Sequence, residues 1–232
     1  MTKGEYGSLL KERLGIGEWL MNSKLPGAIW GSREIADGID RLYFTPRTNH
    51  GGFAFGPSLY AGRQYLPVVA VLQRVSDGDL GMKADSLRLL AHRPASPIAD
   101  IYVRSREEFE EIVSEARAMV CEDILPELER YRYLGPLHAL IEATDPTLRS
   151  GKFGSKPHQA HIAIIKRLVG AADWESYMTH WEKVYREYVQ TPEGAKFTKE
   201  AEILTRLSEL LPDVTPLSTQ EAWGPEGNME AS

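Results

Sequence analysis

The chain lacks features that mark several large classes of protein. It has 232 residues and a single cysteine, Cys121, so no internal disulfide can form, which favours a reducing compartment. No run of about 18 apolar residues occurs, which predicts no membrane-spanning segment. Residues 1–15 carry scattered charges where a secretory signal would have an apolar core. These absences predict a cytoplasmic protein that does not bind a membrane.

Motifs for catalysis and cofactor binding are also missing. The sequence contains no Gly-x-Ser-x-Gly elbow, no dinucleotide fingerprint after a strand, no Walker loop and no His-Glu-x-x-His pattern. We therefore predict no cofactor and no metal. The absence of these motifs favours a binding function, although it leaves an enzymatic one open.

Positive charge is scarce and unevenly distributed. The chain has 27 Lys and Arg against 33 Asp and Glu, a formal charge of −6. Residues 1–104 carry 13 basic against 10 acidic side chains, giving +3, and residues 105–232 carry 14 against 23, giving −9. Nucleic-acid binding needs a basic surface that replaces counterions, so no nucleic-acid partner is expected.

The longest helical pattern runs from Ser105 to Arg130. Ser105 followed by Glu108 fits a capping box, which predicts the start of a helix. Apolar residues at helical spacing form one stripe of this segment: Phe109, Ile112, Val113, Ala116, Met119 and Val120. Pro126 predicts a break or kink, because proline removes a hydrogen bond and clashes with the preceding turn. Cys121 is expected to be a small buried core residue.

The side opposite this stripe is acidic. Residues 107–129 contain nine acidic side chains and one basic one, Arg117, a balance of −8. Such a surface is typical of a solvated helix, and it is also suited to steering a basic partner. If a partner binds here, we expect the contact residues to be Glu107, Glu111, Glu115 and Glu122.

The order of patterns along the chain predicts an α+β fold. A helix over residues 3–22 is expected to precede a mostly antiparallel sheet of about five or six strands. The candidate strands are Ala28–Glu34, Ile39–Thr45, Gly52–Phe55, Leu66–Val75, Ser86–His92 and Ile98–Arg104. The run Val68–Leu72 is continuously apolar, which is typical of a central strand. Residues 1–104 would hold this helix and sheet.

Residues 105–211 are expected to be helical, to pack on the sheet and to share one core with it. Gly135 and Pro136 predict a break before a helix that ends at Ala143, and residues 149–158 a loop. Another helix should run from near Pro157 to Gly170, and Asp173 should cap the next, whose aromatic stripe is expected to be core. Residues 212–232 are predicted to be a flexible acidic tail in which Trp223 is the candidate for docking.

Three groups of residues are candidates for chemistry, each with a structural alternative. His158 and His161 share a helix side and could hold a metal, but lone structural histidines are the simpler interpretation. The cations Arg149, Lys152 and Lys156 precede a helix start and could bind an anion, or could lie in an ordinary loop. His50 with Arg47 and Arg63 could form a catalytic rim, or a turn between strands.

The chain also resembles a known group of proteins. The strands reading DRLYFTPRTN and QYLPVVAVLQRV, followed by SREEFEEIVSEARAMVCEDILPELERY, resemble a bacterial family of domains of unknown function. The likeness covers mainly residues 39–75 and 105–140. Some members look like immunity proteins encoded beside secreted toxins, and the family supplies no catalytic residues. The resemblance implies a binding function.

The leading hypothesis from the sequence is a non-enzymatic protein-binding module, of the kind of an immunity-type inhibitor of a cognate toxin, whose partner has a basic surface. The first alternative is a small hydrolase or transferase with a site in a cleft between sheet and helices. The second is a structural or oligomer-forming module.

Overall fold

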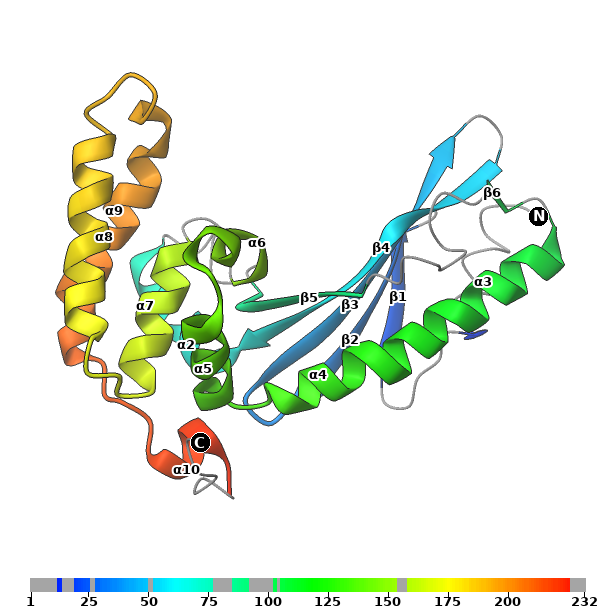
Figure 1. Cartoon of the computed structure of the whole chain (residues 1–232), viewed down its shortest axis with the longest axis horizontal. Helices are drawn as coiled ribbons and strands as arrows, with labels where there is room; N and C mark the ends of the chain where they lie inside the picture. The colour runs from blue at the N-terminus through cyan, green and yellow to red at the C-terminus, as the bar shows by residue number, and fades with distance from the viewer. Residues whose placement is uncertain are drawn as a thin grey trace. The chain divides into compact units, whose positions relative to one another are not determined.

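The computed structural model in Figure 1 describes residues 12–13, 19–25, 28–49, 52–76, 85–91, 102–103, 105–153 and 158–225. The chain divides into two compact units. The first comprises residues 1–63 and 88–129, and the second residues 64–87 and 130–232. These units differ from the predicted ranges 1–104, 105–211 and 212–232, because residues 64–87 belong with the C-terminal helices and residues 105–129 with the sheet.

An antiparallel sheet forms the first unit together with one long helix, which confirms the predicted α+β class (Figure 1). Four long strands form the main antiparallel sheet, where the sequence predicted five or six: β1 (Leu20–Leu25), β2 (Ala28–Ile35), β3 (Gly38–Asn49) and β4 (Gly52–Tyr65). Two short strands, β5 (Leu87–Ala91) and β6 (Tyr102–Val103), add to β4. In the register of β2 and β3, Arg33 lies opposite Asp40.

The predicted N-terminal helix over residues 3–22 is wrong at its C-terminal end, where strand β1 begins. Glu12 and Arg13 are helical, and most of the remaining range lies outside the described residues. From Leu20 onward the backbone pairs with β2, with Leu20 opposite Ser32. The helical pattern was interrupted by two glycines, so pairing with the neighbouring strand decides the structure of this segment.

The long acidic segment forms a single continuous rod of helix, which Figure 1 shows lying along the sheet. It comprises α3 (Arg106–Met119), a π-helical turn (Val120–Ile124) and α4 (Leu125–Arg130). In the π turn the Leu125 N–H donates to the Val120 carbonyl, five residues earlier. No break occurs at Pro126 itself. We attribute the wider turn to this proline, which cannot donate to the residue four positions earlier and whose ring crowds its carbonyl.

The π turn also keeps the apolar side of the rod continuous. Each of the following residues is at most 2% exposed: Val113, Ala116, Met119, Val120, Ile124 and Leu128. An uninterrupted α-helix would have turned Glu127 toward the position of Phe109. The extra residue in the wider turn moves the register so that Leu128, not Glu127, is buried.

The second unit begins with a helix where the sequence predicted a strand. α2 (Leu66–Val75) has Pro67 in its first turn, a position where the missing N–H costs little. Its buried residues have helical spacing: Val68, Val69, Val71, Leu72 and Val75. Ala70, Gln73 and Arg74 are exposed, so the apolar run that suggested a central strand is one side of a helix.

Among the helices of this unit, α7 (His158–Leu168) contacts α2, α5, α8 and α9. The others are α5 (Leu134–Ala143), α6 (Arg149–Lys152), α8 (Trp174–Tyr188), α9 (Thr198–Leu210) and α10 (Thr219–Trp223). Short 3-10 turns span Pro146–Leu148, Ala195–Phe197 and Leu211–Asp213. The predicted stop at Gly170 is confirmed, since this residue has a φ of +71°.

Three local predictions for this unit were wrong. α5 starts at Leu134 and passes through Gly135 and Pro136, because a proline in the first turn does not break a helix. The first part of the predicted loop 149–158 is α6, and residues 154–157 lie outside the described ones. On α8 only Met178 is buried, and its aromatic residues are half-buried or exposed.

The predicted flexible tail is folded over the part that the structure describes. The Leu217 N–H donates to the Leu168 carbonyl at 2.8 Å, which joins the segment to the end of α7. Ser218 and Glu221 form a capping box that starts α10. At its end, the Trp223 ring lies against Gly135 of α5. Trp223, the candidate for docking, therefore packs on the second unit.

The contact between Trp223 and Gly135 leads to the first prediction. A methyl group at Gly135 would lie 2.3 Å from Cδ2 of Trp223, so Gly135→Ala should displace the ring and destabilise the protein by about 1–3 kcal/mol. Hydrogen exchange of the Gly224 amide, which donates to Gln220, should become faster. Adding Trp223→Ala removes the clash and provides the control. A stability gain in Gly135→Ala, as expected of alanine in an uncrowded helix, would contradict this packing.

Candidate protein-binding surface

The acidic side of the rod formed by α3 and the π turn is presented outward. Three of the four predicted contact residues, Glu107, Glu111 and Glu122, are exposed and Glu115 is half-buried. The start of the helix is fixed by the predicted capping box: the Glu108 N–H donates to Ser105 Oγ at 3.1 Å, and the Ser105 N–H donates to Glu108 Oε2 at 3.3 Å. The side chains therefore project from a helix whose first turn is held in place.

The charge of Glu107 is stabilised by local hydrogen bonds. Hydrogen bonds from its own backbone N–H and from Ser105 lower the pKa of Glu107, so it stays ionised as the pH falls. Glu110 lies 3.3 Å from Arg106 and 3.6 Å from Arg13, pairs that are exposed and therefore weak. Residues 107–129 carry a formal balance of −8, and negative charge of this kind attracts a basic partner.

A buried arginine anchors the rod to the sheet. Arg63 on β4 is fully buried, and its Nε and Nη2 donate to the two oxygens of Asp40 at 2.5 and 2.8 Å. Its Nη1 donates to the backbone carbonyl of Leu128 on α4. One guanidinium group therefore joins β4, β3 and α4, and it compensates the carboxylate of Asp40, which has no exposed surface.

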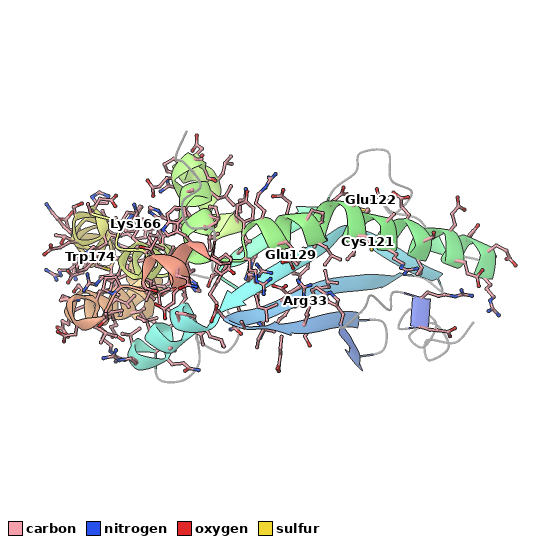
Figure 2. The ribbon with its side chains drawn as sticks, turned by 90° about the horizontal axis from the view of Figure 1, so that it is seen from below. Arg33, Cys121, Glu122, Glu129, Lys166 and Trp174 are labelled. Atoms are coloured by element: carbon pink, nitrogen blue, oxygen red, sulfur yellow. The ribbon has the colours of Figure 1, made fainter. Side chains whose placement is uncertain are left out.

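A second arginine extends this network to the surface. Nη2 of Arg33 donates to Asp40 Oδ2 and to Glu129 Oε1, both at 2.7 Å. The guanidinium group also lies 5.2 Å from the ring centroid of Trp19. Figure 2 shows Arg33 and Glu129 directed toward each other. Glu129 therefore belongs to the anchor of α4, whereas Glu107, Glu111 and Glu122 project outward.

The structure corrects the predicted catalytic rim. Arg63 was expected to clamp an anion together with Arg47 and His50, but its Nε and Nη2 donate to Asp40 and its Nη1 donates to Leu128, inside the protein. His50 lies outside the described residues, and for Arg47 only the backbone, in β3, is described. Sequence reasoning missed Asp40, although it has the same strand phase as the buried Leu42, a signal of a buried charge that needs a partner.

Two of the three predicted anion-binding cations interact within their own unit. Arg149 donates from Nε to the Thr144 carbonyl at 3.0 Å. Lys152 has its Nζ 5.8 Å from the ring centroid of Phe153. Both side chains are half-buried, and Lys156 lies outside the described residues. Among the described residues, Arg149 and Lys152 therefore do not form a common anion-binding site.

The two histidines of the predicted metal pair, His158 and His161, lie in different environments. His161 is 2% exposed, while His158 is half-buried and its pKa is lowered by burial and by Arg149. Within the described ranges, no group of three His, Cys, Asp or Glu side chains could hold a metal ion.

Cys121, predicted to be buried, is exposed on the π turn, because the buried positions there are Val120 and Ile124.

Comparison with protein-family models, with curated proteins and with solved structures finds no match to this chain. Among the residues that the structure describes, no helix has both the length and the apolar character needed to cross a membrane.

The anchor generates the second prediction. Arg63→Met should leave the Asp40 carboxylate buried without its bidentate partner and lower the free energy of unfolding by about 3–5 kcal/mol. Urea denaturation measures this loss, and Arg88→Met, which removes an exposed arginine of β5, is the matched control. Combining Arg63→Met with Asp40→Asn should cost less than the sum of the two single changes. Equal effects of Arg63→Met and Arg88→Met would refute the anchoring role.

Proposed function

We propose that this protein is a non-enzymatic binding module that contacts a basic surface of a partner protein through the acidic side of α3. The observation that carries the proposal is the division of this helix into two sides. The apolar side of the rod is buried, and its outer side exposes Glu107 and Glu111 on α3 and Glu122 on the π turn that follows. An immunity-type inhibitor that covers a cognate toxin is the form of this function that we favour.

The rigidity of the helix supports this proposal. The rod is fixed at its start by the capping box and at its end by Arg63 and Arg33. A surface that is ordered before binding loses less conformational entropy when a partner associates. Complementary charge mainly raises the rate of association and selects among partners. A fixed acidic helix therefore suits selective recognition of a basic protein.

The third prediction concerns these glutamates. We expect Glu→Gln at positions 107, 111, 115 and 122 together to weaken binding of a captured basic partner by about tenfold or more, since charge complementarity is lost. The dependence of affinity on salt should also decrease. The measurement is titration calorimetry at low and moderate salt against a partner purified by affinity capture at low salt.

The matched control removes the same charge from the second unit. Glu175, Glu187, Glu193 and Glu202 are exposed, and Glu→Gln at these four positions should leave affinity and its salt dependence unchanged. Unfolding curves of both variants establish that each is folded. An equal loss of affinity in the two variants would show that only net charge matters and would reject α3 as the contact surface.

A further inference from the structure

A cluster of ionisable side chains lies within the second unit, where α5, α7 and the turn before α8 meet. Lys166 of α7 is only 2% exposed. Its Nζ lies 2.8 Å from Oε1 of Glu142 on α5 and 2.7 Å from Oδ2 of Asp173. It also lies 5.4 Å from the ring centroid of Tyr177 on α8. Figure 2 labels Lys166 in the second unit. One ammonium group thus holds three elements.

His138 borders this cluster. It lies on α5, one turn before Glu142, and its Nε2 is buried without a hydrogen-bond partner among the described residues. Oε1 of Glu142 lies 3.8 Å from this Nε2. The same oxygen accepts Lys166 at 2.8 Å. A proton on His138 would therefore create a second cation beside Oε1 of Glu142, which already pairs with the Lys166 ammonium group.

Burial and charge decide which form of His138 the fold prefers. Burial lowers its pKa below the usual 6.5, and the Lys166 charge lowers it further, while Glu142 and Asp173 act in the opposite direction. The two carboxylates are 44% and 58% exposed, so water screens them, whereas the 2% exposed Lys166 is screened little. The neutral imidazole is therefore favoured in the folded protein.

Other charged groups near α5 have partners of their own. α10 also packs against α5, and its ionisable residue Glu221 accepts hydrogen bonds from Ser218. At the C-terminal end of α5, Arg149 donates to the Thr144 carbonyl. The groups described as facing His138 are therefore Glu142, Lys166 and Asp173.

We propose that His138, Glu142, Lys166 and Asp173 form a pH-sensitive lock, which holds α5, α7 and the start of α8 together while His138 is neutral and loosens when His138 is protonated. Protonation places a cation with little access to water near Lys166 and draws Glu142 away from it. Asp173 precedes α8 but makes no side-chain cap, because its carboxylate is held by Lys166. Weakening the Lys166 interactions therefore frees the turn between α7 and α8.

The same end of α7 holds the C-terminal segment. Arg167 donates to the carbonyls of Leu211 and Pro212 at 2.9 and 3.0 Å, and its guanidinium lies 4.8 Å from the Trp174 ring centroid. Loosening of the turn is therefore expected to spread to this segment. Its earliest sign should be faster hydrogen exchange of the Ala171 amide, which donates to the Lys166 carbonyl at 2.9 Å.

The fourth prediction tests this lock with the full chain. The folded state binds the His138 proton less readily than the unfolded state, so stability is complete above pH 6.5 and is lost as the pH falls below it. When the pH is lowered from about 8 to about 5, the ratio of unfolded to folded protein should increase in wild type. This increase should be larger, by a factor of about three or more, than the increase in His138→Gln, whose side chain cannot titrate. Urea denaturation measures both ratios.

His180→Gln is the matched control, because His180 is an exposed histidine of α8, and it should follow the wild-type pH dependence. NMR titration of the His138 ring should show a pKa below 6.5 that rises in Lys166→Met. Exchange of the Ala171 amide should accelerate at low pH in wild type and not in His138→Gln. Identical pH dependence of wild type and His138→Gln, or a His138 ring that titrates at or above 6.5, would overturn the proposal.

Discussion

The Asp40 carboxylate, which has no contact with water, imposes the strongest constraint on the first unit. An ionised carboxylate in such a position is tolerated only if charged donors surround it. Arg63 and Arg33 supply them, and each also reaches α4, one through a backbone carbonyl and the other through Glu129. Neutralising one buried charge therefore positions the long helix relative to the strands. The orientation of its acidic side follows from this constraint.

The second unit depends on a buried charge of the opposite sign. Lys166 is nearly inaccessible, and it draws carboxylates from α5 and from the turn before α8. In both units, a charge inside an apolar core specifies which elements must meet, in addition to the nonspecific burial of aliphatic side chains. The two networks differ in one respect. The network at Asp40 consists of carboxylate and guanidinium groups, whereas the one at Lys166 borders a histidine, the side chain type that responds to pH changes near neutrality.

Features set by the pattern of residues within one helix or strand could be predicted from the sequence. Features that depend on contacts between residues far apart in the chain could not. The capping box at Ser105, the helix that stops at Gly170 and the α+β class were predicted correctly. α2 was misread because its valines favour a strand, although their spacing and Pro67 fit a helix. The buried pair of Asp40 and Arg63 joins residues 23 positions apart. Its existence was signalled by the phase of Asp40, but its partner could not be derived from spacing.

The π turn between α3 and α4 has a consequence for the evolution of this chain. It is in effect a one-residue insertion within a helix, and a helix advances by about 100° per residue. Deletion of one residue from 120–124 would remove this insertion, restore a regular helix and keep Leu128 directed toward the core. A regular helix formed without such a deletion would rotate everything after the turn relative to α3 and direct Glu127 toward the core in place of Leu128. Homologues that lack the wide turn should therefore align with this chain only through a single-residue gap at this point.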